Sequence, residues 1–185
     1  MIDVNQLRKG TTFTIDGEIY RVIEFQHYKP GRGNAVIRTK IRNLRTGSSL
    51  ERNFTSGNKV EDIRLDRVEV QYLYHDDDFY YFMDTRTFEQ IPVSATVLGD
   101  SVGFLLENMT LEITSYEGEV LDVELPINVD LKVVDAPVVI AGDTATGVTK
   151  LVTLESGFKL TVPLFVNEGD TVRVDTRTGA YVTRM

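Results

Sequence analysis

Apolar residues alternate with polar ones in short runs along most of the chain, and turn residues separate the runs. The runs TFTI and EIYRVIEFQHY, for example, flank Asp16-Gly17. A period of two places successive side chains on opposite faces of a strand, and Asp-Gly is typical of tight hairpins. The pattern therefore predicts an all-β fold built from local hairpins.

Turn residues and shifts in composition divide the chain into three segments. Residues 1–64 contain the hairpins expected of a small barrel. Residues 65–128 contain strand pairs around one expected helix, in VSATVLGDSVGFLL with Ser94 as its N-cap, which suits a five-stranded OB-type barrel. Residues 129–185 contain five more short strands. We expect three small β-barrel domains with these boundaries.

Charge is distributed unevenly over the three segments. Residues 1–64 hold 12 Lys+Arg and 7 Asp+Glu, residues 65–128 hold 2 and 14, and residues 129–185 hold 6 and 7. The net charge of the whole chain is −8. A basic first segment can bind phosphate locally, while the acidic remainder limits indiscriminate binding to RNA.

The segment HYKPGRGNA, residues 27–35, lies at the expected tip of a hairpin between strands 19–28 and 35–44. Proline fixes φ and glycine permits positive φ, so turn formers stand on both sides of Arg32. We therefore expect the Arg32 side chain to project outward.

The strand after this loop, AVIRTKIRNL, carries a basic stripe. Because arginine and lysine bind phosphate, the stripe favours a nucleic-acid contact over a merely solvated strand face. Alternation places Arg38, Lys40 and Arg42 on one face of the strand and Ile37, Thr39 and Ile41 on the other.

The sequence lacks the residue clusters that specify catalysts and metal sites. It has no cysteine, and neither His27 nor His75 stands in a metal-ligand spacing. In GDTATGVTK, residues 142–150, the lysine stands too far from the second glycine for a nucleotide-binding loop, which leaves an exposed loop able to contact a ligand. We expect no metal, no cofactor and no membrane partner, and a cytoplasmic protein.

Two segments resemble the bacterial elongation factor P family. YKPGRGNA resembles its KPG-(Lys/Arg)-G-x-A loop. KLVTLESGFKLTVPLFVNEGDTVRVDTRTGAY resembles its C-terminal signature, with L-E-x-G, V-P-x-F-V, G-D and D-T-x-x-G-x-Y in order. The resemblance extends over the whole chain and implies a KOW-like (SH3-like) N-terminal barrel followed by two OB-fold barrels.

The resemblance implies a translation elongation factor that is not itself an enzyme. Such a protein, expected as a monomer, binds both ribosomal subunits between the peptidyl and exit sites, beside peptidyl-tRNA. It relieves stalling at consecutive prolines, and Arg32 matches the loop-tip residue that in the family reaches toward the peptidyl-transferase centre. Proline reacts slowly there, and positioning of the tRNA end would lower the entropic part of the barrier.

The same resemblance and the basic stripe assign roles to further residues. The loop around Arg32 comprises Lys29, Pro30, Gly31, Gly33 and Asn34. Contacts with RNA are expected at Arg38, Lys40, Arg42, Asp143, Thr144, Gly147, Tyr181 and Arg184.

The loop tip departs from the family pattern, and several alternatives stay open. Most members carry a modified lysine at the tip, and members with a rhamnosylated arginine usually have S-G-R-N, whereas this chain has P-G-R-G. Gly33 thus leaves open whether Arg32 is modified, and with which group. It also leaves open whether a modifying enzyme is a partner. The alternatives are the two-domain archaeal and eukaryotic 5A factor, a general KOW-type RNA-binding protein, an enzyme of OB architecture and a duplicated homologue of elongation factor P.

Overall fold

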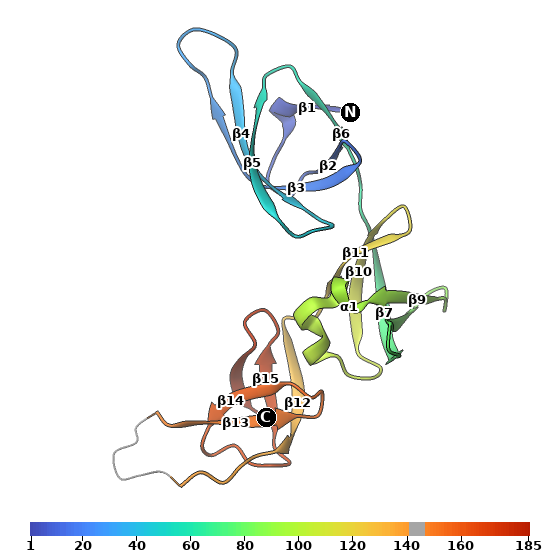
Figure 1. Ribbon diagram of the computed structural model, residues 1–185, viewed down its shortest axis with the longest axis vertical. Helices are drawn as coiled ribbons and strands as arrows, with labels where there is room; N and C mark the ends of the chain where they lie inside the picture. Colours follow the sequence, from blue (N-terminus) through green and yellow to red (C-terminus); the bar gives the residue numbers. More distant parts are fainter. Residues whose placement is uncertain (141–146) are drawn as a thin grey trace. The chain divides into compact units, whose positions relative to one another are not determined.

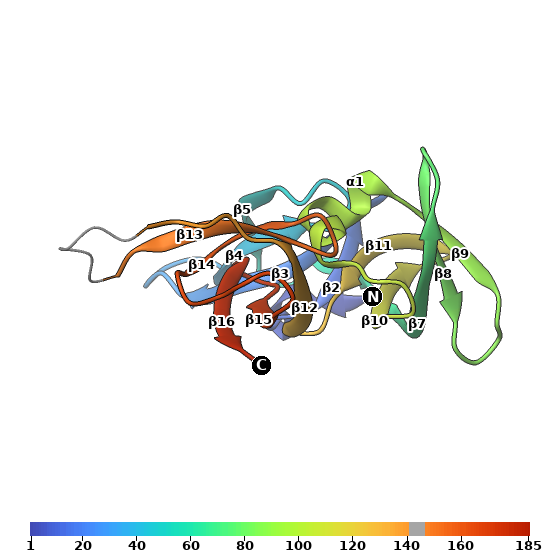
Figure 2. The same cartoon turned by 90° about the horizontal axis from the view of Figure 1, so that it is seen from below.

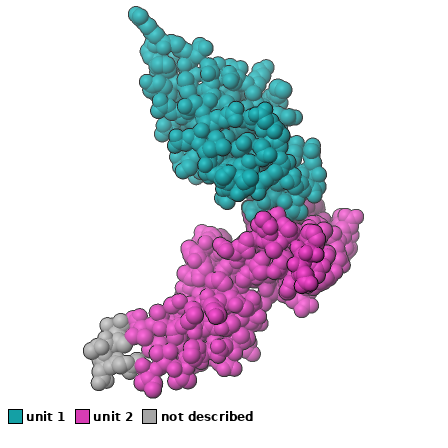
Figure 3. Space-filling view, viewed as in Figure 1, with its two compact units in different colours: residues 1–67, 114–122 teal, residues 68–113, 123–185 magenta. Residues whose placement is uncertain are grey.

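The computed structural model describes residues 1–140 and 147–185, whose strands form three sheets (Figure 1). The prediction of an all-β fold with three β-sheet domains is confirmed. The chain divides into two compact units, residues 1–67 with 114–122 and residues 68–113 with 123–185 (Figure 3). The segment boundaries given above stay a prediction.

The first sheet has six strands in the order β1-β6-β2-β3-β4-β5. Strand β6 pairs with both β1 and β2, and the core packs inside the curved sheet around Phe13, Ile37 and Ile41. The hairpins predicted around Asp16-Gly17 and between strands 19–28 and 35–44 are confirmed, and a further hairpin turns at residues 45–47. The elements are β1 (Ile2–Asp3), η1 (Val4–Gln6), β2 (Thr12–Ile15), β3 (Glu18–Tyr28), β4 (Val36–Asn43), β5 (Ser49–Thr55) and β6 (Lys59–Asp62).

The second sheet has five strands in the order β11-β10-β7-β8-β9. Strands β7 and β8 pair antiparallel on both sides of the turn at residues 76–78, which agrees with the strand pairs expected in this segment. The strands are β7 (Asp66–His75), β8 (Phe79–Asp84), β9 (Gln90–Ser94), β10 (Thr110–Tyr116) and β11 (Glu119–Glu124).

The helix between β9 and β10 is shorter than the sequence predicts. Helix α1 spans only Ala95–Leu98, and a 3-10 helix, η2, continues over Gly99–Phe104. Gly99 has a φ of 52°, which lies outside the right-handed helical range and ends α1. Ser94 occupies the N-cap position, but its side chain makes no capping hydrogen bond. The prediction of one regular helix is therefore wrong beyond Leu98.

The third sheet has five strands, as the sequence predicts, and their order is β14-β13-β12-β15-β16. Its core also takes in Phe104 of η2, whose ring lies 4.6 Å from that of Phe158, so η2 and the third sheet share one core within the second unit. The strands are β12 (Asn128–Asp135), β13 (Thr149–Leu154), β14 (Lys159–Pro163), β15 (Thr171–Asp175) and β16 (Ala180–Arg184).

Candidate nucleic-acid interface on the first sheet

The loop between β3 and β4 carries Arg32 and extends beyond the body of the first sheet (Figure 1). The two strands pair as far as Tyr28 and Val36, so the loop comprises residues 29–35. Gly33 has a φ of 116°, a conformation that favours glycine. Arg32 is exposed, as predicted, and has no hydrogen-bond or ion-pair partner among the described residues. Its guanidinium is therefore available to a ligand.

A cation–π contact lies at the base of this loop. The guanidinium carbon of Arg38 stands 4.8 Å from the centroid of the Tyr28 ring, within the distance at which such contacts are attractive. Phe25 and His27, further along β3, pack edge to face at 6.0 Å, and Arg8 lies 5.3 Å over the Phe25 ring. These contacts pack the side chains of β3, the strand that leads to Arg32, against their neighbours.

Strand β4 alternates between buried and exposed residues as predicted. The buried hydroxyl of Thr39 donates a hydrogen bond of 2.7 Å to the carbonyl oxygen of Arg52 on β5. The geometry of the stripe is confirmed, whereas its contact with RNA stays a prediction. The buried residues are Ile37, Thr39, Ile41 and Asn43, and the exposed ones are Arg38, Lys40 and Arg42.

The cations of the stripe have different neighbours on the adjacent strands. In register, Lys40 lies between Glu24 of β3 and Glu51 of β5, whose carboxylates offset its charge. Arg42 lies opposite Arg21 of β3, so positive charge accumulates there. By this register, neighbouring carboxylates offset the positive charge at Lys40, whereas a second cation adds to it at Arg42.

A groove of about 400 Å³ lies over β3, β4 and β5. Its lining mixes cations, carboxylates and amides, so it offers both donors and acceptors of hydrogen bonds to a polar ligand. The lining residues are Glu24, Phe25, Gln26, Arg38, Thr39, Lys40, Glu51 and Asn53.

The remaining candidates belong to the second compact unit. Asp143 and Thr144 lie outside the described residues, and Gly147 is exposed with a φ of 86°. The Tyr181 side chain packs against the core of the third sheet. Arg184 is held by the protein itself, because its guanidinium lies 5.1 Å over the Phe165 ring and 3.5 Å from an Asp170 carboxylate oxygen. These contacts leave both tail residues partly engaged.

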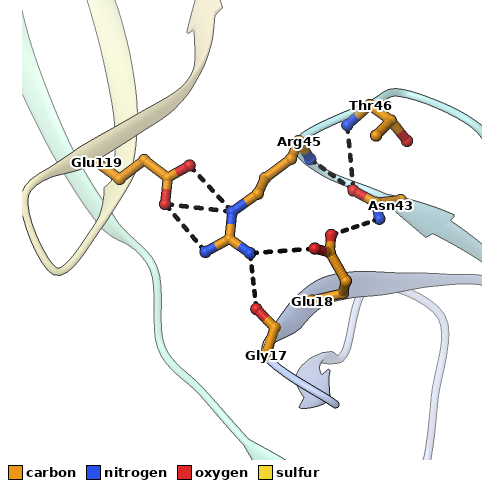
Figure 4. A network of polar contacts seen from close by, with 6 residues as sticks. All are labelled: Gly17, Glu18, Asn43, Arg45, Thr46 and Glu119. Atoms are coloured by element: carbon orange, nitrogen blue, oxygen red, sulfur yellow. Dashed lines mark hydrogen bonds and ion pairs between the residues drawn. The ribbon is translucent and has the colours of Figure 1, made fainter.

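Arg45, in the turn between β4 and β5, forms a network that the sequence did not indicate (Figure 4). Its Nε and Nη2 donate bonds of 3.0 Å each to the two carboxylate oxygens of Glu119, a bidentate arrangement that raises the pKa of Arg45. Its Nη1 donates to the Gly17 carbonyl at 2.6 Å and lies 3.6 Å from Glu18. Because Glu119 stands 74 residues away along the chain, no local spacing could have revealed this network.

His75 contacts two tyrosines of the second sheet. The His75 ring stacks on Tyr80 at 5.0 Å, and its Nδ1 lies 3.0 Å from the hydroxyl of Tyr72. Within residues 1–140 and 147–185, no group of three or more His, Cys, Asp or Glu side chains is placed to hold a metal ion. No helix in that part of the chain is both long and apolar enough to cross a membrane.

Matches to known protein families cover nearly the whole chain. Residues 3–60 match the "Elongation factor P (EF-P) KOW-like domain", residues 65–123 the "Elongation factor P (EF-P) OB domain" and residues 129–184 "Elongation factor P, C-terminal". Together with the three sheets, these matches define the class of protein, a translation factor built from KOW-like and OB-type β domains.

Individual relatives agree with this class over their full length. "Elongation factor P" of Moorella thermoacetica and that of Symbiobacterium thermophilum are each 50% identical to the chain over 184 residues, with 100% of both chains covered. The solved structure "Eukaryotic translation initiation factor 5A from Methanococcus jannaschii" is similar in fold, with a TM-score of 0.56 at 23% identity, covering 66% of this chain and 92% of that one. The chain belongs to the elongation factor P family, whose members are translation elongation factors that associate with the ribosome.

Proposed function

We propose that the chain binds the ribosome between the peptidyl and exit sites, beside peptidyl-tRNA, and accelerates peptide-bond formation at consecutive prolines. Membership of the family supports the ribosome as the partner. The observation that carries the rest is Arg32, an exposed cation without a partner among the described residues, at the tip of the long β3–β4 hairpin. Such a side chain can reach into a site that the body of the domain cannot enter.

In this proposal Arg32 acts by positioning and the chemistry stays with the ribosome. The fixed φ and secondary amine of proline disfavour the geometry of attack, which makes the reaction slow. A planar guanidinium that binds oxygens near the tRNA end would hold the reacting groups in a productive arrangement and lower the entropic part of the barrier. The factor therefore needs no nucleophile or proton-transfer group of its own and is not an enzyme.

The other candidate residues would bind RNA around this centre. The stripe on β4 would contact phosphates of tRNA or ribosomal RNA. On the small subunit, the loop with Asp143, Thr144 and Gly147 would approach messenger RNA. Tyr181 and Arg184, on β16, would add contacts with RNA.

The test is the rate of peptide-bond formation on a triple-proline message in a purified translation system. We expect the unchanged protein to raise this rate. With Arg32→Ala the rate should be about tenfold lower than with the unchanged protein, because the reacting ends are no longer held. Arg52→Ala is the matched control, because it removes an exposed arginine of β5 on the other face of the sheet from the stripe. This variant should raise the rate as much as the unchanged protein does.

A message without prolines should show little gain with either protein. If Arg32→Ala and the unchanged protein accelerate the triple-proline reaction equally, the positioning role is wrong. If neither accelerates it, the intact mass of the protein from its native host shows whether Arg32 carries a group that the purified protein lacked.

A further inference from the structure

An aromatic surface lies on the β7–β8 hairpin, which extends from the second sheet (Figure 2). The register places Tyr81 between Tyr74 and Pro92 on one face, and we call these residues together with Phe79 the aromatic face. The rings of Tyr74 and Tyr81 stack with centroids 4.7 Å apart and planes at 25°. Tyr74 is 50% exposed and Phe79 41%. Clusters of solvent-exposed aromatic side chains are typical of interaction sites.

Hydrogen bonds order the aromatic face before any partner binds. The Tyr81 hydroxyl donates to a carboxylate oxygen of Asp76 at 2.8 Å. The other oxygen of Asp76 accepts the backbone N–H groups of Phe79 at 2.7 Å and Asp78 at 2.9 Å, which shapes the hairpin turn. These bonds also hold the pKa of Asp76 below its ordinary value, so that the carboxylate stays charged. Rings that are already fixed lose little conformational entropy on binding.

The part of the sequence that carries the aromatic face is acidic, and three of its carboxylates, Asp76, Asp77 and Asp78, lie in the turn of the hairpin. Residues 68–113 contain nine Asp+Glu and one basic residue, Arg86. Asp77 and Asp78, in the turn itself, are exposed and have no ion-pair partner in the described part of the chain. This charge attracts cations and repels phosphate, so it disfavours nucleic acid even though bases stack on aromatic rings.

We propose that the aromatic face binds an arginine-containing basic segment of a protein partner. A guanidinium is planar and weakly hydrated, so it can stack on Tyr74 while a neighbouring arginine pairs with Asp77 or Asp78. A lysine can form the ion pair but stacks less well. The surface lies outside the Arg32 loop and the basic stripe, and the proposal goes beyond the function proposed above.

The probe for this surface is a short labelled peptide of alternating arginine and glycine, titrated into the full chain and followed by fluorescence anisotropy. We expect saturable binding and weaker binding of the lysine–glycine peptide. Tyr74→Ala should weaken the binding of the arginine peptide about threefold to tenfold. Tyr74→Leu, which keeps apolar surface without a π face, should weaken this binding to a similar degree. Phe88→Gly removes an aromatic side chain that is 70% exposed, in the β8–β9 turn, and should leave binding unchanged.

The double variant Asp77→Asn/Asp78→Asn should weaken binding and flatten its salt dependence, because both removed charges face solvent. Circular dichroism of each variant reports whether the fold is kept. Equal binding by the unchanged protein and Tyr74→Ala would overturn the proposal, as would tighter, Tyr74-dependent binding of a single-stranded oligouridylate. The assay contains no ribosome and leaves Arg32 in place, so its failure is distinct from a failure of the translation assay.

Discussion

At the scale of single residues, Phe88 stands in a backbone conformation that its side chain disfavours. Its φ is 62°, in the left-handed region, and the residue is 70% exposed. The corresponding positions in two related turns are glycines, Gly47 with a φ of 75° and Gly179 with 68°. A bulky residue in this region costs energy that glycine avoids.

We therefore expect Phe88→Gly to stabilise the protein by about 1 kcal/mol, the strain relieved less the backbone entropy that glycine adds to the unfolded chain. Scanning calorimetry of the full chain measures the change. The reciprocal control, Gly47→Ala, has the same backbone geometry and should destabilise by about 1 kcal/mol. A loss of stability in Phe88→Gly would mean that the ring makes a stabilising contact that its exposure conceals.

At the scale of elements, one type of turn closes a hairpin in each of the three sheets. In all three, the first side chain accepts the N–H two residues later at 2.7–2.8 Å, and the first carbonyl accepts the N–H four residues later at 2.8–2.9 Å. Such side-chain turns substitute for backbone hydrogen bonds where strands end. The turns are NLRTG (43–47), DTRTF (84–88) and DTRTG (175–179).

The turn at Asp175 predicts a pH dependence. Hydrogen bonds from the Arg177 side chain and backbone lower the pKa of Asp175 from 3.8 to about 2. Because the pKa is lower in the folded state, this carboxylate contributes stability above pH 3.8 that is lost as the pH falls toward 2. Asp175→Asn should thus lower the melting temperature at pH 7, and the difference from the unchanged protein should shrink through that window. Asp77→Asn, at an exposed position without a partner in the described chain, should show no such trend.

Local turn chemistry made the hairpins predictable. Asp16 and Gly17, for example, have φ values of 53° and 80°, the two left-handed residues that a type I′ turn requires. The neighbours of Lys40 could not be predicted in the same way, because they depend on the register of three strands and on an irregularity in β3 between Val22 and Glu24. Sequence periodicity thus located the stripe but not its local charge.

At the scale of the whole molecule, the chain separates its charges by segment. The first 64 residues hold 12 Lys+Arg against 7 Asp+Glu, while residues 65–128 hold 2 against 14. The first segment carries the exposed Arg32 and Arg42, and the second carries the aromatic face with its acidic turn. The two surfaces therefore suit partners of opposite charge, phosphate for the one and arginine for the other.

The final prediction concerns the salt dependence of ribosome binding. Each phosphate contact that is lost should weaken binding and reduce the slope of log affinity against log salt by about one. Arg42→Ala should show this full effect, because Arg42 lies opposite a second arginine, Arg21. Lys40→Ala should show a smaller one, since two glutamates flank Lys40 in register.

Arg52→Ala is the control for this series, because Arg52 lies opposite the buried Thr39 and its guanidinium stands 5.6 Å over the Phe54 ring, on the other side of the sheet from the stripe. We expect its slope to match that of the unchanged protein. Binding measured over a range of salt concentrations, with ribosomes carrying peptidyl-tRNA, decides the matter. Equal slopes for all three variants would show that general positive charge, and not the register of β4 with its neighbours, determines the contact with RNA.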